Sequence, residues 1–465
     1  MGKTSVIIRM AVETSSGVEV LEFSGEDVIN ANLVDEVNPP SLELPISEIE
    51  FQIYSTDPRF SLFSVGEFEQ AFTQGQKVSL YGVFEGEEKH MGDYFLEDWA
   101  TPREYIYKFR AVNIIGVLDK ITYDGGFWVN LTSAHTVVSS ILSEHNISFY
   151  GSYIQNKSVK GWIKPGTVRE AIHQVAFAIG ATVTATLNGG LHFAPITLPI
   201  NNSYSLLTIL RPQKINRQNV DRLQQTSSIE LISHEYTKQP DTKVEIIYNA
   251  VLAPGDYKVV FEKPYYDITV EGVGFIAINL ATEYGDSLVT EGGDEIVIDG
   301  GYIFGPNYLY LTVAAPGGQV VVSGYPWVDS MRSHLHTESN TVGKNAIKID
   351  SATLVSLDNA DTLLALLRDY HRQRFVQEAT VIKKKGSGGG IEQVNYGVQA
   401  YGTFRYGNVS HTYAPLHDLA VNNCVTVETI SNHKIKGVIE MMETDLTGGM
   451  ITKLKVRGIE VSDGD

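Results

Sequence analysis

The sequence of 465 residues contains a single cysteine, Cys424. One thiol excludes an internal disulfide framework and most metal sites built from thiolates. Long hydrophobic runs are also missing, because no apolar stretch reaches the roughly 18 residues that a membrane helix needs. The first ten residues, MGKTSVIIRM, lack the apolar core of a secretory signal. The sequence therefore predicts neither a membrane span nor a cleaved signal peptide.

Positive charge is scarce as well. The chain has 36 Lys and Arg against 55 Asp and Glu, which gives a formal net charge of −19. Proteins that bind nucleic acids need clustered Lys and Arg to displace counterions from phosphates. This balance argues against a nucleic-acid-binding protein. It suits a soluble protein, or the wall of a channel to which a polyanion must not adhere.

Motifs that mark catalytic sites are absent. The sequence has no H-E-x-x-H, no G-x-S-x-G, no EF-hand loop and no dinucleotide-binding glycine pattern. Acidic pairs such as Asp35-Glu36 and Glu87-Glu88 are frequent, as the net charge requires, and none stands out as the acid and base of a glycosidase. The sequence therefore predicts no enzyme, with no catalytic, cofactor-binding or metal-binding residue.

Two stretches carry weak signals of chemistry and have simpler interpretations. Gly2-Lys3-Thr4 resembles the end of a phosphate-binding loop, but the chain begins too late for the preceding glycine and strand. Cys424 and His433 could form a nucleophile and base. Cys424 lies in a stretch typical of a strand, whereas reactive cysteines sit at helix N-termini or in positive pockets, so an inert thiol is favoured.

Two further candidates involve histidines and aromatic residues. His334, His336 and Glu338 alternate, so they would share one face of a strand and could bind zinc. Their polar neighbours favour a solvated loop. Tyr325-Pro326-Trp327 could stack against a sugar ring, but packing within a turn is favoured.

Residues 163–196 form the most regular stretch of the sequence. Thr167 followed by Glu170 predicts a capping box at the start of a helix. Apolar residues then recur at helical spacing as far as Ile179, and Gly180 supplies a left-handed stop. Alternating residues from Ala181, the turn Asn188-Gly189-Gly190 and a return strand complete a helix followed by a hairpin.

The rest of the chain reads mainly as strands. Residues 1–120 contain closely spaced strand patterns typical of an antiparallel sandwich or barrel. A helix is predicted near 134–144, residues 201–235 are polar, and strands resume from about 240 to 335. A helix over about 359–375 has Asp358 as its expected cap. Residues 383–390, KKKGSGGG, predict a flexible basic loop, and residues 395–460 return to strands.

Several stretches together resemble the baseplate hub, or tail-hub, proteins of bacteriophages and phage-derived injection machines. They include Val28–Leu33 leading into Ser41–Ser47, Gln76–Val78, Gly92–Leu96, Ala111–Asp119, the 163–196 module, Ala360–Tyr370, Gly437–Ile439 and Asp445–Gly449. The likeness runs from about residue 25 to 460. It depends on the order in which the motifs occur along the chain. Where the family often has a Gly-Asp turn, this chain has Asn422-Asn423, and asparagine tolerates the same positive φ.

The resemblance implies a mainly β fold with α+β insertions. Residues 1–120 would form a first antiparallel β-barrel like a tail-tube subunit, and residues 201–235 with 376–465 a second. Residues 121–200 would form an α/β helix-hairpin domain, and 236–375 a β-rich outer domain ending in a helix. Three subunits would then make a pseudo-six-fold ring without any cofactor.

The implied partners are other copies of the chain, a tail tube or distal tail protein, and a central spike or fibre. DNA would pass through the channel without specific binding, and the protein, made in the host cytoplasm, would reside at the tail tip of the virion. Two alternatives stay open. The chain could be the hub part of a tail-associated cell-wall lysin, whose catalytic domains would follow its C-terminus, or residues 236–335 could bind host glycans.

Overall fold

The computed structural model describes residues 5–14, 17–38, 43–57, 60, 72–84, 87–199, 207–209, 219–239, 242–272, 302–304, 307–313, 315–338, 345–382, 399–406, 409–413, 420–429, 433–447 and 451–461. Strands dominate these residues, so the prediction of a mainly β protein is confirmed. The sequence stretches Gly2-Lys3-Thr4 and 383–390 lie outside the described residues. No described helix is long and apolar enough to cross a bilayer.

The N-terminal block consists of seven antiparallel strands. These are β1 (Ser5–Thr14), β2 (Gly17–Ser24), β3 (Val28–Glu36), β4 (Glu48–Tyr54), β5 (Lys77–Phe84), β6 (Glu87–Arg103) and β7 (Ile106–Val112), in the spatial order β3-β4-β7-β6-β5-β1-β2. Alternate residues of each strand point into one core, where the rings of Phe51 and Phe109 stack with centroids 5.0 Å apart. Between β6 and β7, Tyr105 turns the chain with φ 62°, and β7 begins at Ile106.

The C-terminal block is built around two long strands, β30 (Lys434–Asp445) and β31 (Ile451–Val461). Strand β26 (Phe375–Ile382) pairs with β31, and β29 (Cys424–Glu428) pairs with β30. The short strands β15 (Leu207–Ile209) and β16 (Val220–Arg222) add to β29 and β26. A separate hairpin joins β27 (Gln399–Tyr406) to β28 (Val409–Tyr413). The strands within residues 207–222 thus pair with strands from the last hundred residues of the chain.

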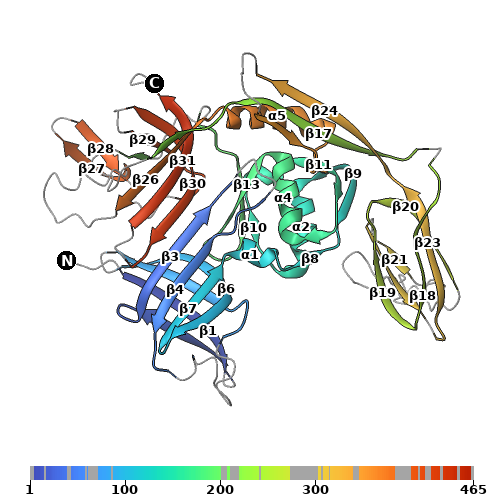
Figure 1. Cartoon of the computed structure of the whole chain (residues 1–465), viewed down its shortest axis with the longest axis horizontal. Coiled ribbons are helices and arrows are strands. Elements are labelled where there is room, and N and C mark those ends of the chain that lie inside the picture. Colours follow the sequence, from blue (N-terminus) through green and yellow to red (C-terminus); the bar gives the residue numbers. More distant parts are fainter. Residues whose placement is uncertain are drawn as a thin grey trace, which may run out of the picture.

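The two blocks form one continuous sheet. Strand β3 pairs antiparallel with β30, from Asn32 opposite Asp445 to Glu36 opposite Met441. Figure 1 shows the blue N-terminal strands side by side with the red C-terminal strands. The main path runs from β16 to β2, and within the described residues no hydrogen bonding closes either block into a barrel. The first and last parts of the chain therefore share a single sheet of 13 described strands.

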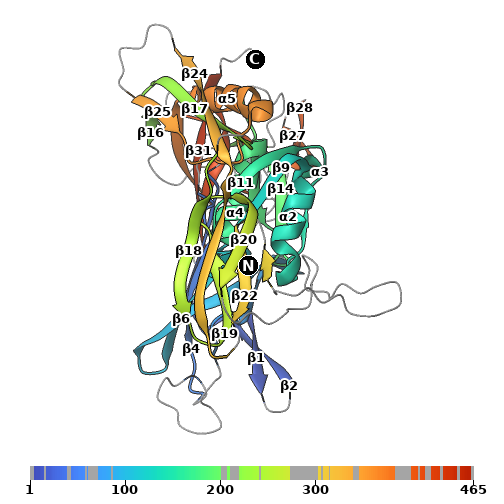
Figure 2. The same cartoon turned by 90° about the vertical axis from the view of Figure 1, so that its right-hand side faces the viewer.

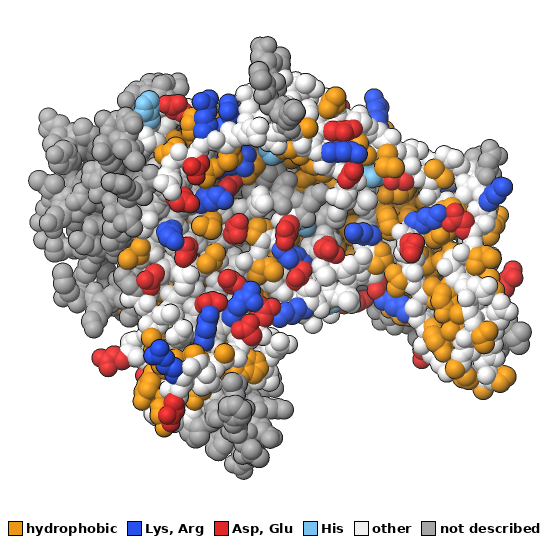
Figure 3. All heavy atoms as spheres, viewed as in Figure 1, with side chains coloured by type: hydrophobic (Ala, Val, Ile, Leu, Met, Phe, Trp, Pro, Cys, Tyr) orange, Lys and Arg blue, Asp and Glu red, His pale blue; other side chains and the backbone are white. Residues whose placement is uncertain are grey.

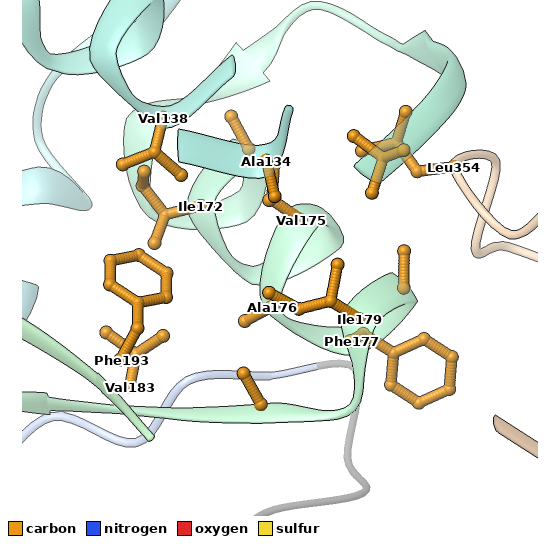
Figure 4. Close-up of a cluster of buried hydrophobic side chains, with 14 of the residues drawn as sticks. Ala134, Val138, Ile172, Val175, Ala176, Phe177, Ile179, Val183, Phe193 and Leu354 are labelled. Atoms are coloured by element: carbon orange, nitrogen blue, oxygen red, sulfur yellow. The ribbon is translucent and has the colours of Figure 1, made fainter. Parts of the chain in front are cut away.

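Residues 114–195 form a helical module beside the junction of the blocks. It contains α1 (Ile114–Leu118), β8 (Thr122–Tyr123), β9 (Gly126–Ser133), α2 (Ala134–Leu142), the short helix η2 (Ser143–His145), β10 (Phe149–Tyr150), α3 (Ser152–Gln155), β11 (Ser158–Ile163), β12 (Gly166–Thr167), α4 (Val168–Ile179), β13 (Ala181–Ala185) and β14 (Leu191–Pro195). Figure 4 shows α4 burying Ile172, Val175 and Ala176 between α2 and the β13–β14 hairpin. The helix predicted near 134–144 and the hairpin after Gly180 are both confirmed.

The capping signals of α4 operate as the sequence predicts. The Thr167 hydroxyl accepts a hydrogen bond from the Glu170 amide at 3.2 Å, and the Glu170 carboxylate accepts one from the Thr167 amide at 3.0 Å. Gly180 ends the helix with φ 68°, a conformation that costs glycine little.

The helix α5 (Leu357–His371) packs on a sheet formed by β17 (Thr226–Thr237), β24 (Val328–Thr337) and β25 (Asn345–Ile349). Strand β17 begins within residues 201–235, the segment assigned to the second barrel, yet it pairs with β24 and β25. The prediction of Asp358 as helix cap is wrong, because Ser356 occupies the N-cap position. The Asp358 carboxylate instead pairs with the Lys160 ammonium at 2.8 Å.

Strands β17 and β24 extend away from the main sheet to an outer sandwich (Figures 1 and 2). One layer contains β18 (Glu245–Leu252), β23 (Gly318–Pro326) and β20 (Tyr265–Gly272). The other contains β19 (Gly255–Val260), β22 (Tyr308–Val313) and β21 (Tyr302–Phe304). Phe261, Leu309 and Val322 fill the space between the layers. The β-rich character expected of this region is therefore present.

Candidate functional site

The junction between the N- and C-terminal blocks is the first candidate for a functional site. Beyond the β3–β30 ladder, the Val37 amide donates to the Glu440 carbonyl at 2.8 Å, and the Leu446 amide donates to the Ala31 carbonyl at 2.9 Å. The Leu446 side chain is fully buried in the core of the N-terminal block. A residue of the C-terminal block thus completes the N-terminal core, so the two blocks are one structural unit.

The helical module joins the same junction through its hairpin. The Asp93 amide of β6 donates to the Leu187 carbonyl at 2.9 Å. The Asn422 side-chain amide donates to the Thr182 hydroxyl of β13 at 3.2 Å. Asn422 has φ 68°, so the positive φ expected in the Asn422-Asn423 turn is confirmed. Three parts of the chain that are far apart in sequence therefore meet at one place.

A cavity of about 300 Å³ lies where these three parts meet, and we call it the junction cavity. Its apolar lining comes from β3, β6, α1, the hairpin, the 420–421 turn and β30. Its polar lining comprises the charged or titratable side chains Asp35, Glu36, Lys89, His90, Asp93 and Tyr94, the Asn113 amide and the hydroxyls of Ser47, Thr184, Thr186, Thr444 and Thr452. The volume lies at the lower end of the range of small-molecule sites.

Asp93 is a paired carboxylate at one side of the junction cavity. The Lys77 ammonium lies 2.7 Å from its carboxylate, the Ser79 hydroxyl donates at 2.7 Å, and His90 Nε2 lies at 3.0 Å. Burial acts to raise the pKa of Asp93, but these partners outweigh it and hold the pKa below its usual value. Asp93 is therefore a stably ionised group with its partners in place.

Asp35 is a different kind of carboxylate. Burial raises its pKa to about 6, and a hydrogen bond from Ser47 offsets the effect only in part. Among the described residues, no cation forms an ion pair with Asp35. Burial, followed by the charges of Asp35 and Asp93, raises the pKa of Tyr94 well above its usual value. The sequence showed Asp35 only as a member of an acidic pair, because burial depends on contacts distant in the chain.

A second buried network fixes α5 to the C-terminal block. The Tyr370 hydroxyl donates to the Glu440 carboxylate, and the Arg457 guanidinium lies over the Tyr370 ring, 4.2 Å from its centroid. Burial, together with the charge of Glu440, raises the pKa of Tyr370. This network is a structural link, since each of its polar groups is engaged within the chain.

The structure separates Cys424 from His433. Cys424 is buried in β29, and burial raises the pKa of its thiol, which opposes thiolate formation. Cys424 lies opposite Val438 in the sheet, five residues from His433, a span of about 16 Å along a strand. His433 instead contacts Glu460 through Nδ1. The expected strand at Cys424 is confirmed, and the nucleophile–base pair is not formed.

The solvated loop expected at His334 and His336 is wrong, because both lie in β24 and pair with β17. His336 Nε2 contacts the Glu338 carboxylate at 3.1 Å. Within the described part of the chain, no group of three potential ligands is arranged to hold a metal ion. The alternation of these side chains was a strand signal, obscured by their polarity.

His334 takes part in an arrangement that the sequence did not reveal. Its Nε2 lies 2.9 Å from the Ser233 hydroxyl, and its Nδ1 lies 2.9 Å from the Asp361 carboxylate. This is the connectivity of a serine hydrolase triad. The Ser233 side chain is fully buried between β17 and β24, however, so its hydroxyl cannot reach a substrate. The arrangement ties α5 to the β17–β24 sheet.

The aromatic residues weighed for sugar stacking pack against other residues of the chain. Tyr325 stacks on Tyr266 with centroids 5.5 Å apart, and Trp327 contacts both Tyr266 and Phe127. These residues therefore pack within the chain, but the expected turn is wrong, because Tyr325 and Pro326 lie in β23 and Trp327 directly precedes β24.

Glu88, from the acidic pair Glu87-Glu88 of the N-terminal block, forms an ion pair with the Arg9 guanidinium at 3.0 Å.

Figure 3 shows acidic and basic side chains interspersed over the central part of the face seen there, while hydrophobic side chains gather over the outer sandwich. Exposed apolar residues of that sandwich include Ile246 and Val251 on β18. On the main sheet, Val18 and Val20 are exposed on β2, which ends the described strand path. Exposed apolar residues on sheet edges are common at protein contacts.

This chain is similar to known proteins in structure, while its sequence matches none of those compared. No protein-family profile and no curated protein matches the sequence. A 43 kDa tail protein of prophage MuSo2 from Shewanella oneidensis is 10% identical, with 97% of this chain and 98% of that chain covered and a TM-score of 0.47. A tail protein from Neisseria meningitidis MC58 is 10% identical, with coverage of 98% and 97% and a TM-score of 0.49.

The prophage tail protein gp18 from Listeria monocytogenes EGD-e is also 10% identical, with 98% of this chain and 95% of that chain covered and a TM-score of 0.48. All three are described as tail proteins.

Proposed function

We propose that this chain is a structural hub of a phage or phage-like tail, in which three copies form a ring around a central channel. The observation that carries the proposal is the antiparallel pairing of β3 with β30, which sets two β blocks side by side in one subunit. If each block is one tube-like barrel segment, three subunits present six such segments. A ring of this kind matches a six-fold tail tube to a three-fold spike or fibre.

The domain arrangement supports this geometry. The N-terminal block (within 1–120) and the C-terminal strands (within 201–235 and 376–465) would form the wall of the ring. The helical module (114–195) and the outer sandwich with α5 (within 236–375) extend from one side of the sheet (Figure 1). The exposed edge strand β2 suits a contact between copies.

The charge of the chain supports passage of a polyanion. A net charge of −19 per subunit disfavours adhesion of DNA to the channel, so DNA would pass without specific binding. The proposed partners are further copies of the chain, a tail tube or distal tail protein, and a spike or fibre. The proposed location is the tail tip of the virion, after synthesis in the host cytoplasm.

A role without catalysis agrees with the burial and packing of the residues that could have been reactive or could have bound a sugar. Cys424 and Ser233 are buried, and the sugar-stacking candidates Tyr325 and Trp327 pack against neighbouring rings. No feature of the described residues specifically favours the lysin alternative or the glycan-binding alternative.

Light scattering coupled to size-exclusion chromatography tests the proposed stoichiometry. One chain has a mass of 51.3 kDa, so three give about 154 kDa. We expect a species of this mass to grow as protein concentration rises, because ring closure depends on concentration. A dimer or tetramer as the terminal species would overturn the three-fold hub.

A further inference from the structure

The junction cavity contains an unusual combination of groups. Leu33 and Asp35 lie on one face of β3, and the register places them opposite Thr444 and Met442 of β30. The Thr444 and Thr452 hydroxyls are 3.1 Å apart on neighbouring strands. One wall of the cavity therefore offers a carboxylate and hydroxyl oxygens directly beside apolar side chains.

The remaining walls add apolar surface. Met91 of β6, Val183 and Leu187 of the hairpin and Val421 of the 420–421 turn all line the cavity. An apolar space with oxygen acceptors at one wall suits a ligand that has an alkyl chain and a terminal group rich in N–H donors.

The electrostatics select the sign of that terminal group. Asp35 is partly buried, and a carboxylate withdrawn from water without a counter-ion is costly to keep ionised, whereas a cation within the same site restores the balance. The other charged or titratable groups lining the cavity are Glu36, Lys89, His90, Asp93 and Tyr94. Asp93 already has Lys77 and His90 as partners. Among the described residues, Asp35 is hydrogen-bonded by the Ser47 hydroxyl and pairs with no cation.

We propose that the junction cavity binds an alkylammonium or alkylguanidinium group, with Asp35 as its counter-ion and the neighbouring hydroxyls as additional acceptors. The group could be a free amine or the side chain of a lysine or arginine from a partner. The site lies within one chain, so it does not depend on ring formation. Binding would brace the place where the two β blocks and the helical module meet.

Calorimetric titration of the full chain with n-butylammonium chloride tests the site, with n-butanol as the neutral comparator. We expect saturable binding of the ammonium ion and none of the alcohol. Asp35→Asn removes the counter-ion at nearly constant shape and should weaken binding at least about tenfold, the scale of one charge-assisted contact. Glu26→Gln, a control that removes one negative charge from an exposed position outside the cavity lining, should keep the affinity within about threefold.

A second measurement requires no variant. Below the raised pKa of Asp35, about 6, a proton competes with the cation for the carboxylate. The affinity of the unaltered protein should therefore fall about tenfold between pH 7.5 and pH 5. Equal binding of butanol, unchanged affinity in Asp35→Asn, an affinity independent of pH, or no saturable binding would each overturn the proposal.

Two further ligands identify the source of the cation. Tighter binding of putrescine than of α-acetyl-lysine amide assigns the cavity to free amines, and the reverse order assigns it to a partner's side chain. Either order supports the site. Because these titrations use the single chain, their failure would leave the ring hypothesis unaffected, and a chain that forms no ring could still bind the amine.

Discussion

Asp35→Asn should stabilise the protein in neutral solution, although it removes a charged residue. The pKa of Asp35 is raised by burial from 3.8 to about 6. A carboxyl group with a higher pKa in the folded protein than in the unfolded chain binds protons more tightly when folded. The folded state therefore loses stability as pH rises from about 4 to above 6, since Asp35 must ionise while buried.

The size of this effect follows from the same pKa difference. One pKa unit corresponds to about 1.4 kcal/mol, so the rise from 3.8 to about 6 corresponds to about 3 kcal/mol at pH 7.5. Asparagine cannot ionise and retains a hydrogen-bonding group of similar shape. Water that enters the junction cavity reduces the cost of the charge, so the expected gain in unfolding free energy is about 1–3 kcal/mol.

Native-state hydrogen exchange measured by mass spectrometry is a suitable assay. A chain of several structural units need not unfold in one step, whereas exchange reports the opening free energy of each segment. The amides of β3 and β4 should be more protected in Asp35→Asn than in the unaltered protein at pH 7.5, and the difference should vanish near pH 4. Glu36→Gln serves as the charge-matched control. A destabilised Asp35→Asn protein at pH 7.5, or a gain that does not depend on pH, would refute the reasoning.

Three other perturbations have expected outcomes. Leu446→Ala should lower the unfolding free energy of the N-terminal block by about 2–5 kcal/mol, because this buried side chain completes that block's core, and exchange of the β4 amides would show it. Gly180→Ala should cost about 1–2 kcal/mol in a denaturant titration, since φ is 68° and an added Cβ would lie 2.8 Å from Leu366 Cδ2; an unchanged midpoint would contradict this. Cys424 should react with maleimide only as the protein unfolds, because the thiol is buried with a raised pKa, and rapid labelling of the native protein would disprove it.

Local signals in the sequence were sufficient for the helix-hairpin module. Thr167, Glu170 and Gly180 act within a few residues of themselves, and the structure shows each in its predicted role. The helix α5 was also predicted, but with the wrong cap. Ser356 and Asp358 are both good N-cap residues two positions apart, and the ion pair of Asp358 with Lys160 is not visible in the local sequence.

Long-range features could not be predicted from local patterns. Strand β3 joins β30 across some four hundred residues of sequence, and neither strand carries a signal for its partner. The strand at His334 was missed because its side chains are polar, and its pairing with β17 supplies the order. Asp35 could not be distinguished from other acidic residues, since its burial arises from contacts between the block junction and the hairpin.

Negative-stain electron microscopy of the concentrated protein tests the central claim most directly. The hub hypothesis predicts rings of three subunits with a central channel, surrounded by six wall segments and by three projecting outer sandwiches. The six segments would correspond to the two blocks that β3 and β30 join in each chain. Particles that remain compact monomers at every concentration, or rings with a different number of subunits, would contradict it.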